Sequence, residues 1–173
     1  MRRTALSLAL AVLALAALAV LLFVTPKGYT RLQLEDVDAA RPLLDAVLRN
    51  GEPVTLTWQN SIYQLPVVEV FYAADGRLVL DTVSFLDPNG AVRNPVRASD
   101  VNDLYHTGGP FSASGMDRPY TDVIFRIGEI GNPHMAVRGR VVAFKDAVGF
   151  GGRVHLMTGR PSLGRALLST LSR

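Results

Sequence analysis

The chain begins with a long apolar segment and continues as short hydrophobic runs separated by turns. The 20 residues from Ala5 to Val24 carry no charge, and Ser7 is the one polar side chain among them. An α-helix rises about 1.5 Å per residue, so such a run spans ~30 Å, the thickness of the hydrocarbon core of a bilayer. The pattern predicts a transmembrane helix at residues 4–24.

A cleaved signal peptide is the alternative explanation for this segment. The apolar core of a signal peptide has ~7–15 residues and is followed by a cleavage site of the Ala-x-Ala kind. Here the run is longer, and Val24-Thr25-Pro26-Lys27 offers no such site, so we favour an anchor or uncleaved signal. Arg2 and Arg3 precede the run, and the positive-inside rule then predicts a cell-membrane protein with a cytoplasmic N-terminus and an extracytoplasmic domain.

Residues 28–160 show the periodicity of β-strands. Polar and apolar side chains alternate at residues 30–35 and again at residues 54–59. Residues 65–85 contain two apolar runs joined by Asp75-Gly76, which is the pattern of a β-hairpin. The fold class expected from these features is mainly β, with a single antiparallel β-sandwich or barrel domain behind the N-terminal helix.

Further strands are expected in the second half of this domain and at one ambiguous position in the first half. Residues 123–127 and 135–144 are strand-like and are separated by Gly131-Asn132-Pro133. Asp87-Pro88-Asn89-Gly90 predicts a turn. Residues 40–49 fit a strand or a short helix, and we favour the strand.

Two segments differ from this β pattern. Residues 92–118 are long, polar and rich in Gly, Ser, Asp and Asn, and we expect a loop of the kind that often carries function. Residues 161–173 predict a short C-terminal helix with Ser162 as its cap. Its apolar face is formed by Leu163, Ala166, Leu167 and Leu171. We expect this helix to pack on its own domain, with a membrane or partner surface as the alternative.

Composition and charge exclude several classes of protein. With 49% hydrophobic and 19% charged residues, the chain can bury a core, which argues against intrinsic disorder. The net charge is +3, and without Arg2 and Arg3 the balance is 16 basic against 15 acidic side chains, too even for a nucleic-acid-binding surface. The absence of cysteine excludes disulfides, thiolate-ligated metals and a lipoprotein anchor.

Motifs with an established chemistry are missing from the sequence. It contains no Gly-x-Ser-x-Gly, no His-Glu-x-x-His and no phosphate-binding or dinucleotide-binding glycine loop. His106, His134 and His155 are widely spaced, so no metal or cofactor is expected. A catalytic triad is defined by geometry rather than by composition. We therefore do not expect an enzyme, and a hydrolase using Ser61 or His134 is kept as an alternative.

Glu69 and Arg126 are the most unusual charged residues. Each interrupts a strand that is otherwise apolar, and Glu69 falls inside the first strand of the predicted hairpin. A buried carboxylate without a partner costs several kcal/mol or changes its pKa. Either both side chains point to solvent, or they pair in a cleft that holds a polar ligand or a partner's loop. We predict that the two are partners.

A set of strand and turn residues resembles a known family. The aromatic strand ends in Asn60-Ser61, and Pro66-Val67-Val68-Glu69-Val70-Phe71 follows it. Ser114-Gly115-Met116 comes later, and Arg126, Gly128, Gly131 and His134 form Arg-x-Gly-x-x-Gly-x-x-His. This pattern, between about Thr30 and Phe144, resembles the bacterial and archaeal family called domain of unknown function 1850. Members commonly have His where this chain has Asn60.

The resemblance implies a biological context rather than a mechanism. Such proteins are small, carry an N-terminal membrane segment and tend to be encoded beside TRAP-type transporters of the TAXI branch. No catalytic residue is carried over from the family. The positions that match its pattern are candidates for binding a ligand or partner: Asn60, Ser61, Glu69, Gly115, Met116, Arg126 and His134.

These observations lead to one main functional hypothesis and to a second alternative, in addition to the hydrolase. The main hypothesis is a membrane-anchored extracytoplasmic accessory or interaction domain, associated with the permease or solute-binding protein of a TRAP-type (TAXI) transporter. The alternative is a small-molecule binding module that uses a cleft near Glu69 and Arg126. The expected organisation is an anchor at residues 4–24, a β domain at residues 28–160 and a helix at residues 161–173.

Overall fold

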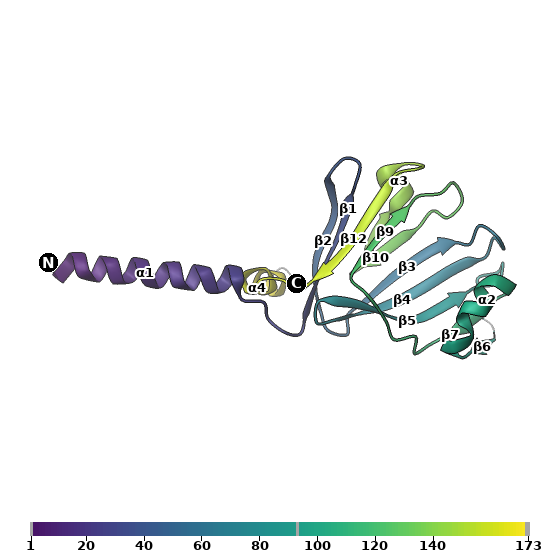
Figure 1. Cartoon of the computed structure of the whole chain (residues 1–173), viewed down its shortest axis with the longest axis horizontal. Helices are drawn as coiled ribbons and strands as arrows, with labels where there is room; N and C mark the ends of the chain where they lie inside the picture. Colours follow the sequence, from purple (N-terminus) through teal and green to yellow (C-terminus); the bar gives the residue numbers. More distant parts are fainter. Residues whose placement is uncertain (1, 93, 172–173) are drawn as a thin grey trace.

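The computed structural model describes the backbone of residues 2–92 and 94–171, and the side chains of residues 9–92, 94–102, 104–105 and 108–170. The chain forms two β-sheets with a long helix at its N-terminus and a short one at its C-terminus, so the prediction of a mainly β fold with a short C-terminal helix is confirmed (Figure 1). The first helix is α1 (Arg2–Phe23) and the last is α4 (Leu163–Leu171).

The smaller sheet has four antiparallel strands, in the order β2-β1-β12-β9. Their bounds are β2 (Arg41–Arg49), β1 (Tyr29–Asp36), β12 (Arg153–Gly159) and β9 (Asp122–Arg126). Residues 40–49 therefore form the strand that the sequence favoured. Strand β12 was not predicted, although it lies between β1 and β9 and connects them.

The larger sheet has the order β11-β10-β3-β4-β5-β7-β6, and β8 pairs with β5. The first five bounds are β11 (Arg140–Ala143), β10 (His134–Val137), β3 (Pro53–Gln59), β4 (Pro66–Ala74) and β5 (Arg77–Phe85). The others are β6 (Pro95–Val96), β7 (Phe111–Ala113) and β8 (Arg118–Tyr120). The predicted hairpin is confirmed as β4 and β5, with Asp75 and Gly76 at positive φ in its turn.

Two sequence predictions were wrong in detail. Residues 135–144 do not form one strand: Arg138 and Gly139 adopt positive φ and turn the chain, so β10 and β11 form a tight hairpin, and helix α3 (Phe144–Val148) follows. Residues 92–118 are not a plain loop. They include β6, a 3-10 turn η1 (Ala98–Asp100), helix α2 (Val101–Thr107) and β7.

The two sheets share one hydrophobic core. Along β1 every second residue is buried, and Leu32 and Leu34 point inward. Val54 and Leu56 of β3 belong to the same buried cluster from the larger sheet. Alternation of this kind places one face of each sheet against the other, and burial of apolar area is the main term that stabilises such a pair of sheets.

An aromatic cluster fills the end of the core beside α2. The ring of Phe85 stacks on Phe111 with centroids 4.7 Å apart and meets Tyr105 edge-on at 5.0 Å. Trp58 also meets Phe85 edge-on, at 6.2 Å. The cluster fixes the orientation of Trp58 and Tyr105, both of which contact the acidic residue described below.

Helix α1 extends away from the sheets, and α4 lies beside its C-terminal end (Figure 1). The backbone N–H of Leu163 donates to the carbonyl of Val24 at 2.7 Å and joins the two helices. Counting only residues whose side chains the structure describes, no helix reaches the length and apolar character needed to cross a membrane. The anchor expected at residues 4–24 therefore stays a prediction.

Candidate functional site

Glu69 points into the space between the two sheets. On β4 it has the same parity as Val67 and Phe71, which are both buried. Its direct neighbours across the sheet, Leu56 on β3 and Val83 on β5, are buried as well. Because alternate residues of a strand face opposite sides, this register places a carboxyl group on the inner, apolar face of the larger sheet.

Two neutral hydrogen-bond donors meet the Glu69 carboxyl group. The indole N–H of Trp58 donates to it, and the Tyr105 hydroxyl lies 3.4 Å from Oε1. Burial raises the pKa of Glu69, and these two hydrogen bonds lower it by less, so the net direction is upward. Desolvation disfavours the ionised carboxylate, and no cation within salt-bridge distance offsets this among the described residues.

The two tyrosines near Glu69 respond to its charge. Burial raises the pKa of Tyr105, and the negative charge of Glu69 raises it further. The pKa of Tyr120 is raised by the same two causes in the same order. Both phenols therefore stay protonated at neutral pH and are available as donors around the acid.

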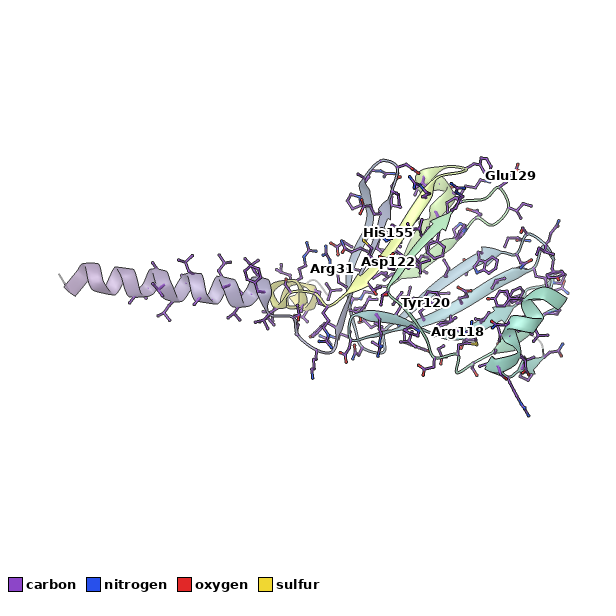
Figure 2. All side chains as sticks on the ribbon, in the orientation of Figure 1. Arg31, Arg118, Tyr120, Asp122, Glu129 and His155 are labelled. Carbon is purple, nitrogen blue, oxygen red and sulfur yellow. The ribbon has the colours of Figure 1, made fainter. Side chains whose placement is uncertain are left out.

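Glu69 lies at the wall of a cleft of about 360 Å³ between the sheets. The cleft is lined by Leu56, Trp58, Glu69, Tyr120, Phe125, Arg126, Gly128, Gly131 and Pro133. Most of these side chains are apolar or aromatic, and the glycines belong to the segment that crosses from β9 to β10. In Figure 2, Tyr120 is labelled where the chain passes from β8 to β9. A mainly apolar cleft with few polar groups is typical of a small-molecule site.

The predicted ion pair between Glu69 and Arg126 is not formed. On β9 the side chains of Val123 and Phe125 pack against the core. Arg126 is the next residue after Phe125 and is exposed. Its neighbour across the ladder is Arg153 of β12, whose hydrogen bond is the main cause of the lowered pKa of Asp38, and the charge of Arg126 contributes least. β9 is the edge strand of the smaller sheet, so Arg126 borders the cleft from an exposed position, and among the described residues it forms no salt bridge with Glu69.

Three other predicted site residues lie around the same crossing segment. Asn60 and Ser61 line a second cleft of about 370 Å³, and His134 lines a third of about 440 Å³. Trp58 and Gly131 border all three clefts. The Oδ1 atom of Asn132, also in the third cleft, is buried and has no hydrogen-bond partner among the described residues.

Gly115 and Met116 do not belong to this region. Met116 is buried in the core, and its backbone N–H donates to the Asp81 carbonyl at 3.0 Å. Gly115 is exposed with φ of +71° in the link between β7 and β8. Neither residue lines the cleft.

Asn60 and Ser61 have a structural explanation. The Oδ1 of Asn60 accepts hydrogen bonds from the backbone N–H groups of Ile62 and Tyr63 at 3.0 and 2.9 Å, which builds the turn after β3. Ser61 is exposed in that turn and, within the described residues, no hydrogen bond links it to His134. The described residues therefore show no contact between Ser61 and His134 of the kind that joins a nucleophile to its base.

The histidines do not form a metal centre in the described part of the chain, which contains no group of three or more potential ligands. His155 pairs with Asp122 at 2.8 Å on the outer face of the smaller sheet, where Figure 2 shows the two side by side. His134 begins β10, and the side chain of His106 lies outside the described residues.

Sequence reasoning missed three residues of the site. Tyr105 lies in the segment that was expected to be a loop, and nothing in its neighbourhood marks it. Tyr120 comes from a three-residue strand that is too short to predict. Trp58 could have been found, because the alternation of β3 places it on the same face as Val54 and Leu56.

Comparisons with known proteins add no relative: no family model matches the chain, and neither a curated protein nor a solved structure is similar to it. The resemblance to domain of unknown function 1850 thus depends on the quoted residues alone.

Proposed function

We propose that this chain binds a small organic cation, such as a substituted ammonium, in the cleft between its two sheets. The observation that carries the proposal is the inward-facing carboxyl group of Glu69, whose hydrogen-bond donors among the described residues are both neutral. Arg126 also lines the cleft but forms no salt bridge with Glu69, so a ligand cation would supply the counter-charge at the carboxyl group. The loss of solvation that raises the pKa of Glu69 is then offset by the bound ligand.

The walls of the cleft fit the same class of ligand. Trp58, Tyr120 and Phe125 surround Glu69 in the cleft, and aromatic faces attract ammonium groups by about 0.5–2 kcal/mol each. A volume of about 360 Å³ is at the small end of ligand pockets and suits a compact molecule. Because a cation binds the ionised carboxylate, its affinity should increase as the pH rises through the pKa of Glu69.

Trp58 provides a direct test, because it is the single tryptophan of the chain and lies in the cleft. The full chain in maltoside micelles is titrated with choline and, separately, with its uncharged carbon analogue 3,3-dimethylbutan-1-ol. We expect Trp58 fluorescence to respond to choline at concentrations at least about tenfold lower than to the neutral analogue. Saturable binding of neither compound would contradict the proposal.

Two variants make the test specific. Glu69→Gln keeps the shape of the side chain but cannot be ionised, so it should lose the preference for choline. Glu35→Gln is the matched control, since Glu35 has the outward parity on β1 and does not line the cleft. Equal responses of the wild type and Glu69→Gln would contradict a role for the carboxylate.

We also propose that residues 4–24 anchor this domain in the cell membrane, with Arg2 and Arg3 on the cytoplasmic side. The support is the uncharged run of 20 residues and the exposure of its apolar side chains, for example Leu13 at 66% and Phe23 at 81%. Exposed apolar surface of this extent has a large cost in water. The chain should therefore stay in the membrane pellet after a carbonate wash, and release into the supernatant would contradict the anchor.

An accessory role beside a TRAP-type transporter is a second proposal, and it depends on the resemblance. Five of the seven residues that match the family pattern line the three clefts around the segment between β9 and β10. If the proposal is right, a tagged copy should co-purify with the permease or solute-binding component encoded beside it. Recovery of the tagged chain alone under mild detergent would contradict it.

A further inference from the structure

We propose that the groove between α4, β2 and the turn of β10 and β11 binds the phosphate of an anionic phospholipid headgroup. The groove has a volume of about 680 Å³ and is distinct from the cleft at Glu69. Three arginines line it: Arg138, Arg140 and Arg165. This inference rests on the proposed membrane anchor, because the anchor would bring the groove to the bilayer surface.

The groove carries more positive than negative charge. Asp45 accepts hydrogen bonds from both Arg31 and Arg165, at 2.6 and 2.7 Å, and the bond from Arg31 is the main cause of its lowered pKa. Arg138 donates to Glu52 at 2.6 Å. Arg140 is exposed and forms no ion pair with the described acidic residues.

Among the described residues, four guanidinium groups and two carboxylates therefore lie in or beside the groove. A guanidinium has five N–H donors, so Arg138 and Arg165 keep donors beyond those used on Glu52 and Asp45. Planar guanidinium groups bind phosphate oxygens in pairs of parallel hydrogen bonds. The surplus of donors and of charge favours a phosphate as the occupant.

The position of α4 favours a lipid as the source of that phosphate. Leu163 and Val24 are joined by a backbone hydrogen bond, and the backbone at Gly164 lies close to the Leu21 carbonyl, so α4 packs directly on the last turn of α1. Leu167 and Leu168 of α4 are 49% and 67% exposed. In Figure 1, α4 lies between α1 and the sheets.

A short helix with exposed leucines and an arginine is typical of a segment that lies in the interface of a bilayer. With α1 in the membrane, the leucines of α4 would meet the acyl boundary. Arg140 and Arg165 would then lie at the level of the headgroups. Leu168, an exposed apolar side chain of the same groove, would contact the first part of an acyl chain.

The experiment uses the full chain in maltoside micelles and native mass spectrometry to count bound lipids. Phosphatidylglycerol and phosphatidylcholine are added in separate titrations. We expect phosphatidylglycerol to bind at about tenfold lower concentration, since hydrogen bonds to charged groups are the stronger class. Equal binding of the two lipids would overturn the inference. Displacement of bound phosphatidylglycerol by an equal concentration of inorganic phosphate would overturn the lipid assignment.

Variants locate the site. The double variant Arg140→Gln/Arg165→Gln should lose the preference for phosphatidylglycerol, and Arg140→Gln alone should reduce it severalfold. Arg140 forms no ion pair with the described acidic residues, so its replacement leaves none of their carboxylates without a partner. The single variant therefore keeps the test valid if the double variant fails to fold. The control Arg97→Gln changes an exposed arginine before η1, at the opposite end of the β domain. Retention of the preference in both groove variants would overturn the inference.

This measurement is independent of whether α1 crosses a bilayer, because lipid is offered in micelles. A protein that is released by carbonate but binds phosphatidylglycerol through Arg140 would contradict the anchor and leave the groove assignment intact. A protein that stays in the membrane pellet after the carbonate wash but shows no preference for phosphatidylglycerol would support the anchor and contradict the groove assignment.

Discussion

The hydroxyl of Tyr105 lies 3.4 Å from Oε1 of Glu69, although the two residues are 36 positions apart and come from a helix and a central strand. The rings of Phe85 and Phe111 both meet the tyrosine ring edge to face and hold it in this orientation. Together with Trp58, Tyr105 makes the half-buried Glu69 carboxyl group a defined polar point in a mainly apolar cleft. The ionisation of Glu69 is consequently the most informative property to measure.

The first prediction concerns that ionisation. Trp58 donates to Glu69, so its fluorescence should change with pH as the carboxyl group titrates, with a midpoint above the ordinary range for glutamate. Tyr105→Phe removes a hydrogen bond that lowers the pKa of Glu69, and the midpoint should therefore move to higher pH. Glu69→Gln should abolish the transition, and Glu35→Gln should leave it unchanged. A transition that persists in Glu69→Gln would show that another group causes it.

The second prediction is the effect of the same group on stability. The folded-state pKa of Glu69 is raised above its ordinary value of 4.5, so the folded state binds more protons than the unfolded state between the two pKa values. The free energy of unfolding should then fall as the pH increases through this window, and the loss is complete above the folded pKa. Urea unfolding at about pH 4 and about pH 8 should show a smaller decrease for Glu69→Gln than for the wild type. Parallel decreases would contradict the raised pKa.

The third prediction concerns the aromatic cluster under the site. Phe85 is 1% exposed and contacts the rings of Trp58, Tyr105 and Phe111. Phe85→Ala should cost about 3–5 kcal/mol of stability in urea unfolding because it leaves a cavity. Ile124→Ala is the control: its side chain is 56% exposed on the outer face of β9, and the change should stay within about 0.5 kcal/mol. Similar losses for both variants would be inconsistent with this core.

The fourth prediction compares two turn glycines. Gly76 has φ of +93°, and an added Cβ would lie 3.0 Å from the backbone N of Arg160, whereas Gly90 has φ of +80° and open space around it. Gly90→Ala should lower the free energy of unfolding by about 1–2 kcal/mol, because alanine is strained in the left-handed backbone conformation. Gly76→Ala should cost more, because backbone of Arg160 must also move. Thermal or urea unfolding gives both values, and equal costs would argue against the close approach of the hairpin turn to Arg160.

The fifth prediction tests the independence of Glu69 and Arg126. Both residues line the cleft, but Arg126 is exposed, forms no salt bridge with Glu69 among the described residues, and is not among the causes of the pKa change of Glu69. In a double-mutant cycle with Glu69→Gln and Arg126→Gln, the stability changes should add to within about 0.5 kcal/mol. A larger coupling energy would restore the ion pair that the sequence suggested.

The sequence predicted those strands and turns that a few neighbouring residues define, either by alternating polar and apolar side chains or by typical turn residues. The alternation at residues 54–59 and the Asp75-Gly76 turn were enough to predict β3 and the hairpin of β4 and β5. β12 was missed although the same signs are present: Val154 and Leu156 alternate with outward-facing residues, and Gly152 and Gly159 lie at its ends. The predicted continuous strand at residues 135–144 failed because one Arg138-Gly139 pair at positive φ reverses the chain.

The sequence by itself determined that the chain is mainly β, that its N-terminal segment is apolar throughout, and that Glu69 interrupts a central strand. These properties depend on composition and short-range periodicity. Only the tertiary structure decided where Glu69 points and what meets it. Its partners Trp58 and Tyr105 come from another strand and from a helix that local propensity does not reveal. The predicted pairing of Arg126 with Glu69 was wrong for the same reason. Which face of a sheet a side chain occupies, and whether its strand lies at an edge, depends on pairing between distant segments, and the apolar residues next to Arg126 in the sequence do not reveal it.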